Sequence, residues 1–220
     1  MYSLSEENYL KAIFHLQRGA NIGVSTNAIA EQMETKASSV TDMIKRLSEK
    51  DLVSYKKYKG VKLSPKGKDA AIQIIRKHRL WEVFLVDQLN FSWDEVHEVA
   101  EQLEHIKSKK LIRELDKFLD YPKMDPHGDP IPDENGNIIV ADKLPLSEIE
   151  VKKITVCVGV NDTSPDFLKF LDKNKISLGK EIKVLEKETF DESMLILVEN
   201  KELRVSKMVS SNIYVKTKSS

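Results

Sequence analysis

The sequence predicts a mainly α-helical chain with a β domain at its C-terminal end. Apolar residues recur with helical spacing from SLSEENYLKAIFHLQR to KKLIRELDKFLDYP, whereas short alternating runs of β-branched residues follow Asp142. Two short helical segments and a hairpin pattern fill the N-terminal part. We therefore expect three domains, at residues 1–64, 65–141 and 142–220, the last a small β-barrel.

Composition limits the class of protein. The chain has 220 residues, of which 40% are hydrophobic and 32% charged, as in soluble globular proteins. The single cysteine, Cys157, excludes an internal disulfide and a CxxC metal cluster, and we interpret it as a small buried hydrophobe. No apolar run approaches the roughly 18 residues of a membrane span, and the N-terminus lacks a signal-peptide pattern. We therefore expect a cytoplasmic protein with no membrane partner.

A winged helix-turn-helix is predicted at residues 1–64. Its first helix is SLSEENYLKAIFHLQR, with Ser5 placed to cap it, and its helix-turn-helix combines VSTNAIAEQME with TKASSVTDMIKRLSEKDLV. The segment LVSYKKYKGVKLSPKG contains two alternating runs around Lys59 and Gly60, which indicates a β-hairpin. A hairpin directly after the recognition helix forms a wing.

The charge of this region indicates a polyanionic partner. Between Lys36 and Lys68, ten Lys and Arg residues oppose three acids, which gives +7 in a chain whose net charge is zero. A three-helix core with merely solubilising lysines is the alternative, but the winged-helix order and the charge together favour double-stranded DNA. The candidate DNA-binding residues are Lys36, Ser38, Ser39, Thr41, Asp42, Lys45 and Arg46 on the recognition helix and Lys56, Lys57, Tyr58 and Lys59 at the wing.

Histidine and glutamate side chains gather on the next two helices. In SPKGKDAAIQIIRKHRLWEVFLVDQL, which Ser64 caps, His78 and Glu82 stand one turn apart. The following helix is expected to begin at Ser92, with Glu95 completing a capping box. One polar stripe of this helix carries His97, Glu101, Glu104 and His105.

This stripe has the chemistry of a metal site. Imidazole nitrogens and carboxylate oxygens bind divalent first-row cations, and three of the five histidines fall between residues 78 and 105. A solvated polar helix face is the alternative. His15 and His127 are interpreted as surface or packing residues, and DPHGDPIP as a turn fixed by its prolines.

The chain resembles the diphtheria-toxin-repressor family of metal-dependent transcriptional regulators in three motifs after the winged helix, namely RKHRLWEVFLVD, WDEVHEVAEQLEH and DPHGDPIP. The family includes iron-dependent repressors and manganese-transport regulators. The resemblance implies a helical metal-binding and dimerisation domain at residues 65–141 and an SH3-like β domain at residues 142–220. It also implies a homodimer that binds a palindromic DNA operator and represses metal-uptake genes.

The resemblance further implies two metal sites per subunit. One would use Asn8, Glu101, Glu104 and His105, and the other His78, Glu82 and His97, with Asp162 and Asp166 as possible donors from the β domain. Iron-type members carry cysteine and methionine where this chain has Glu101 and Asn8. Because these oxygen ligands are harder than sulfur, the sequence favours Mn²⁺, with Fe²⁺ as the alternative.

Two other classes of function remain open on the sequence alone. A winged-helix regulator that senses a small organic ligand would leave the His and Glu stripe merely exposed. A metallohydrolase would use the same ligand types, but the chain lacks an HExxH arrangement and any recognisable pairing of a nucleophile with a base. We therefore expect neither an enzyme nor a small organic cofactor.

Overall fold

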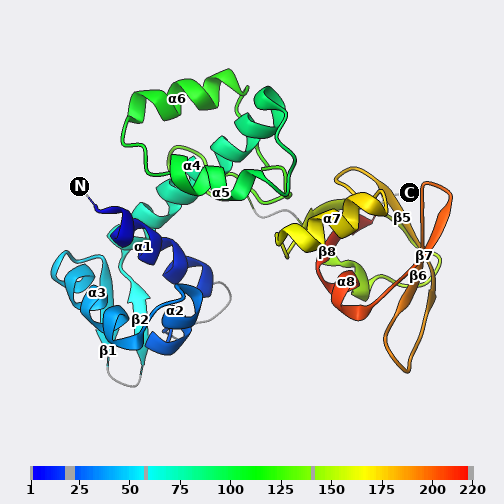
Figure 1. Ribbon diagram of the computed structural model, residues 1–220, viewed down its shortest axis with the longest axis horizontal. Coiled ribbons are helices and arrows are strands. Elements are labelled where there is room, and N and C mark those ends of the chain that lie inside the picture. Colours follow the sequence, from blue (N-terminus) through cyan, green and yellow to red (C-terminus); the bar gives the residue numbers. More distant parts are fainter. Residues whose placement is uncertain (1, 18–22, 57–58, 140–141, 218–220) are drawn as a thin grey trace. The chain divides into compact units, whose positions relative to one another are not determined.

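The computed structural model describes residues 2–17, 23–56, 59–139 and 142–217. They form a mainly helical N-terminal part and a C-terminal β domain, as expected, and are divided into two compact units (Figure 1). The first unit contains residues 1–78, 101–112 and 132–138, and the second contains residues 79–100, 113–131 and 139–220.

The first unit contains the winged helix-turn-helix. Its elements are α1 (Leu4–Leu16), α2 (Thr26–Gln32), α3 (Ala37–Glu49), β1 (Val53–Lys56) and β2 (Gly60–Leu63). The two strands pair antiparallel, and Figure 1 shows the three helices gathered beside this hairpin. The predicted helix-turn-helix and wing are confirmed.

Helix α1 begins earlier than its sequence pattern suggested. The Ser3 hydroxyl accepts the N–H of Glu6, and the Glu6 carboxylate accepts the N–H of Ser3 at 3.0 Å. The predicted cap at Ser5 is wrong, because Ser3 caps the helix in a capping box, which needs Glu or Gln three residues after the cap. Ser3 meets this condition, whereas Ser5 is followed by Asn8 at that spacing.

Helix α3 buries one face and exposes the other. Val40, Ile44 and Leu47 are almost inaccessible to solvent and pack in one cluster with Leu10 and Ile13 of α1. Their spacing of four and three residues places them on one side of the helix. The hydrophobic effect thereby anchors α3 by this side and leaves its polar side in water.

The middle helices are α4 (Pro65–Leu89), α5 (Val96–Leu103) and α6 (Lys109–Phe118). Ser64 caps α4 as predicted, since its hydroxyl accepts the N–H of Gly67 at 3.0 Å. Helix α5 is shorter than predicted and begins at Val96. Of the predicted capping box, the Glu95 carboxylate accepts the N–H of Ser92, but the Ser92 hydroxyl donates to the same carboxylate and does not cap the helix. The stripe therefore divides: Glu104 and His105 lie in the turn after α5 and not on the helix.

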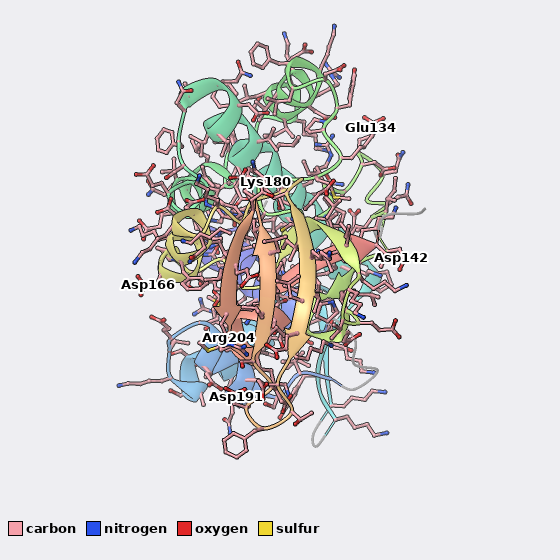
Figure 2. All side chains as sticks on the ribbon, turned by 90° about the vertical axis from the view of Figure 1, so that its right-hand side faces the viewer. Glu134, Asp142, Asp166, Lys180, Asp191 and Arg204 are labelled. Carbon is pink, nitrogen blue, oxygen red and sulfur yellow. The ribbon has the colours of Figure 1, made fainter. Side chains whose placement is uncertain are left out.

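The second unit contains a six-stranded antiparallel sheet with the order β3-β8-β4-β5-β6-β7. Its strands are β3 (Leu144–Pro145), β4 (Ile154–Val160), β5 (Glu181–Lys187), β6 (Met194–Val198), β7 (Lys201–Val205) and β8 (Ile213–Thr217). Figure 2 looks onto strands of this sheet, with Lys180 and Asp191 labelled at opposite ends. The five longer strands were predicted from their alternating residues.

Two short helices accompany the sheet, α7 (Pro165–Lys173) and α8 (Lys207–Ser211), besides a 3₁₀ turn at Leu146–Glu148. The sequence pattern did not predict α7, although Pro165 at its first turn is a typical helix start. Cys157 is 1% exposed within the core of this domain, as expected. Among the described residues, no helix combines the length and the apolar character that crossing a membrane requires.

Candidate metal centre

The first unit brings three carboxylates and two imidazoles together. We call this group the first cluster, and it consists of Glu7, Asn8, Lys11, His78, Glu101, Glu104 and His105. Helix α1 supplies the first three residues, α4 supplies His78, and the end of α5 with the following turn supplies the rest. All the residues of the predicted first metal site thus lie on segments that meet in this unit.

Glu104 is at the centre of the first cluster. Its residue is 0% exposed, and its Oε2 lies 2.7 Å from Nδ1 of His78. The ammonium of Lys11 donates to both Glu104 oxygens at 2.8 Å and also to Glu101. Nδ1 of His105 lies 2.6 Å from Oε2 of Glu7, which connects the turn to α1.

Electrostatics keep this centre charged. Burial raises the pKa of Glu104, but the hydrogen bond from His78 and the positive charge of Lys11 outweigh burial, so the pKa lies below its usual value. The neighbouring Lys77 has a lowered pKa because burial disfavours its charged form, although Glu7 and Glu104 oppose that effect. Glu104 is therefore a carboxylate at neutral pH and suits a cation.

Asn8 provides an independent sign that a cation fits here. Its Oδ1 is shielded from solvent and has no hydrogen-bond partner among the described residues. A buried carbonyl oxygen without a donor costs free energy, and coordination to a metal ion would satisfy it. Oxygen donors from Asn8 and three glutamates, with imidazole nitrogen, form a set that divalent first-row cations accept.

The second unit holds another group, which we call the second cluster, of Arg79, Glu82, Asp125 and His127. The three potential ligands Glu82, Asp125 and His127 are 2%, 5% and 3% exposed, and their ligand atoms lie within 4.8 Å of one another. Nε2 of His127 lies 2.8 Å from the carbonyl oxygen of Trp93. A carbonyl only accepts, so Nε2 carries a proton, and Nδ1 faces Glu82 at 3.6 Å.

The charges of the second cluster are strongly coupled. Burial and the nearby Glu82 raise the pKa of Asp125 to about 6, against the lowering effect of Arg79. The Arg79 guanidinium lies 3.3 Å from Asp125 and 3.0 Å from Asp129, and it donates to the Pro130 carbonyl. Burial lowers the pKa of His127, but the hydrogen bond and the charge of Glu82 raise it above its usual value.

The DPHGDPIP turn holds His127 against the β domain. Oδ1 of Asp125 accepts the N–H groups of His127 and Asp129, both at 2.9 Å. The carbonyl of His127 accepts the N–H of Val160 in β4 at 2.9 Å. Gly128 has φ +80°, and a Cβ there would lie 2.1 Å from a backbone oxygen of β4, so only glycine fits.

The members of the predicted second site have several described partners. His78 contacts Glu104 of the first cluster. The His97 side chain is 50% exposed, and its Nδ1 lies 3.6 Å from Glu82. Asp162 accepts the N–H of Ser164 at 2.8 Å, and Asp166, labelled in Figure 2, is exposed on the first turn of α7. Neither aspartate belongs to a potential metal-binding group among the described residues.

Sequence reasoning missed three of the potential ligands in these clusters. Glu7 precedes the expected ligand Asn8 directly, and its spacing from the other ligands gave no signal. Asp125 and His127 stand two residues apart in a turn interpreted as structural, 43 or more residues from Glu82. The signal available was their chemistry, a carboxylate and an imidazole in one rigid turn.

The candidate DNA-binding residues lie largely on the exposed side of α3. Those described there are all exposed, namely Lys36, Ser38, Ser39, Thr41, Asp42, Lys45 and Arg46. At the wing, Lys56 and Lys59 are exposed, whereas Lys57 and Tyr58 lie outside the described residues. The exposed face of α3 therefore carries hydroxyl, basic and acidic groups that a helix in a major groove would present.

Family models match nearly the whole chain. The N-terminal DNA-binding domain of iron-dependent repressors matches residues 1–61, and their metal-binding and dimerisation domain matches residues 64–133. The FeoA domain matches residues 144–217. The models follow the order of the winged helix, the middle helices and the sheet.

Individual relatives agree with these models. The chain is 31% identical to a manganese-dependent transcriptional repressor in complex with manganese, with a TM-score of 0.87 and coverage of 96% of this chain and 99% of that one. It is 36% identical to the manganese regulator SloR, with a TM-score of 0.77 and coverage of 97% and 98%. It is also 35% identical over 126 residues to the iron-dependent repressor IdeR of Mycobacterium leprae, covering 57% of this chain and 54% of that protein.

The chain belongs to the iron-dependent repressor family of metal-dependent transcriptional regulators, which includes the diphtheria toxin repressor. The resemblance inferred from the sequence is confirmed, and the descriptions of these relatives agree with a protein that is not an enzyme. The matched region spans about half the length of the first curated relatives. Relatives described by manganese and by iron both occur, so membership leaves the metal open.

Proposed function

We propose that the chain is a metal-activated repressor that binds a palindromic DNA operator as a homodimer in the cytoplasm. The first cluster is the observation that carries this proposal, because its buried carboxylates and imidazoles join α1 of the winged helix to the segment after α5. A cation bound there couples the position of α1 to that segment. In a dimer, such coupling would fix the separation of two recognition helices, which need to lie about 34 Å apart.

In the first cluster we assign ligand roles to Asn8, Glu101, Glu104 and His105, and we add Glu7 because it contacts His105. The bound metal supplies a divalent positive charge that these groups share. Carboxylate and amide oxygens are hard donors, and the absence of sulfur ligands favours Mn²⁺ as the activating ion. Fe²⁺ is the second candidate, since a curated relative is named an iron-dependent repressor.

We assign a second metal site to Glu82, Asp125 and His127. Their mutual distances and deep burial support this assignment, and a cation would replace the Glu82 hydrogen bond at Nδ1 of His127. His97 is a further donor from α5, 3.6 Å from Glu82. Asp162 and Asp166 remain proposed donors from the β domain, and His78 is assigned to support Glu104.

For DNA we assign base contacts to the exposed side of α3 and phosphate contacts to the lysines of the wing. Ser38, Ser39 and Thr41 on the first turns of α3 are the candidates for base edges, because small polar groups near the start of a recognition helix reach the groove floor. Lys56, Lys59 and the undescribed Lys57 would neutralise phosphates and make affinity depend on salt.

The proposal is tested by operator binding measured with and without metal. Genomic fragments selected by the Mn²⁺-loaded protein would serve as DNA, with fluorescence anisotropy as the readout. We expect chelator to weaken specific binding by at least tenfold and Mn²⁺ to restore it. Glu104→Gln should remove this response, whereas Glu114→Gln, at an exposed position on α6, should keep it. If chelator leaves specific DNA binding unchanged, the result would favour a winged-helix regulator that senses a small organic ligand.

A further inference from the structure

We infer that Lys11 is the affinity-setting residue of the first cluster: its ammonium is a tethered cation that occupies the metal position and must leave before a metal ion binds. The inference rests on the proposed function of this cluster as a metal site. It concerns a residue that contributes no ligand, and it therefore goes beyond the assignment of the donor atoms.

The position of the ammonium supports this role. Nζ of Lys11 lies 2.8 Å from both oxygens of Glu104. An atom at equal distance from two carboxylate oxygens lies near the bisector of the group, which is where a bidentate metal ion binds. The same ammonium also contacts Glu101. Lys11 therefore blocks the shared face of two carboxylates that we assign as ligands.

The helix explains how Lys11 reaches this position. Lys11 follows Glu7 by four residues and Asn8 by three, so the side chains of all three extend from one face of α1. Lysine has a long stem and a single compact charge, so its head can swing away while the stem stays packed. The Lys11 side chain is 13% exposed, so part of it reaches solvent.

Because both are positively charged, the Lys11 ammonium and a metal ion cannot bind the same carboxylates at the same time. Without metal, Lys11 balances Glu101 and the fully buried Glu104, whose desolvation would otherwise favour protonation. With a divalent ion at the same carboxylates, the ammonium would be repelled at contact distance. Lys11 thus stabilises the metal-free protein and raises the metal concentration needed to fill the site.

Direct metal binding by Lys11→Met tests the inference, because methionine keeps much of the stem and removes the charge. We expect Mn²⁺ to bind the variant roughly ten- to a hundredfold more tightly than the parent, the usual range of coupling between two ligands. The metal-free variant should melt at a lower temperature. Lys68→Met, at an exposed position on α4, is the control for net charge and should change neither value. Equal or weaker Mn²⁺ binding by folded Lys11→Met overturns the inference.

Amine labelling of the unmodified protein gives a second test that does not depend on a variant folding. With mass spectrometry as the readout, Mn²⁺ should increase the labelling of Lys11 by an amine-reactive ester and leave Lys68 unchanged. Unchanged or decreased labelling of Lys11 in Mn²⁺-loaded protein overturns the inference. The proposed function fails separately, if the parent binds Mn²⁺ no better than Glu104→Gln does.

Discussion

The two clusters share their ligand chemistry but differ in the cation that balances it. In the first cluster, Lys11 extends from α1 and contacts Glu104 and Glu101 through one ammonium. In the second cluster, Arg79 is 3% exposed, and its guanidinium contacts two aspartates and the Pro130 carbonyl. The Lys11 ammonium is a single compact charge on a flexible stem, whereas the Arg79 guanidinium is a planar group held by several partners.

This difference indicates which cluster can exchange its cation. On our inference, the head of Lys11 swings away on its long stem, and the carboxylates of the first cluster exchange one cation for another. Arg79 holds the turn that carries Asp125 and Asp129, so its departure would unmake the turn. We therefore interpret the first cluster as the exchangeable centre and the second as a centre whose frame exists before any metal binds.

Removing Arg79, the cation of the second cluster, should have the largest effect on stability. Arg79→Met should destabilise the protein by about 3–5 kcal/mol, because it leaves a buried carboxylate without its partner. Urea unfolding at pH 7.5 with chelator present measures this free energy. Arg113→Met, at a position whose side chain is 69% exposed, is the matched control and should cost less than about 0.5 kcal/mol. A loss for Arg79→Met no larger than that for Lys11→Met would show that the clusters do not differ in this way.

A softer ligand in the first cluster should change which metal ion activates the protein. Glu101→Cys replaces a hard oxygen by a thiolate, which favours Fe²⁺ over Mn²⁺. We expect Mn²⁺ to lose activation of DNA binding relative to Fe²⁺ by on the order of 1–3 kcal/mol, the usual size of an allosteric coupling. Anaerobic titrations with both metals give the values, and Glu98→Cys, exposed on the same helix, controls for the thiol. If the ratio of the two metals stays unchanged, Glu101 is not a ligand.

The sequence predicted the helices and strands that have a periodic pattern of apolar residues. It missed the features that depend on contacts between residues far apart in the chain. Alternating residues identified the strands from Ile154 onward, and helical spacing identified α1 to α4. The predicted α5 was too long at both ends, because local pattern cannot show that the Ser92 hydroxyl donates to Glu95 or that Glu104 contacts Lys11 and His78.

The second cluster was missed for the same physical reason. Asp125 and His127 become a candidate site only when the fold brings their turn to Glu82. The first cluster was predicted more fully because its residues on α5 and the adjoining turn are close in sequence. Lys11 was not singled out, since its role depends on carboxylates about ninety residues away, and no period in the sequence reports such a distance.

The smallest expected effect concerns Cys157, on the strand against which the turn of the second cluster rests. Burial raises the pKa of its thiol to about 11 from 9.0, although a hydrogen bond to Gly159 opposes the shift. Because the pKa is higher in the folded state, the stabilising contribution is present below pH 9 and is lost as the pH rises toward 11. Between pH 8 and 9.5, the parent should therefore lose about 0.8 kcal/mol more unfolding free energy than Cys157→Ala. Equal losses of unfolding free energy would mean that water reaches the thiol. Strand β4, which holds the turn of the second cluster, would then be less rigid than our interpretation of a preformed second cluster requires.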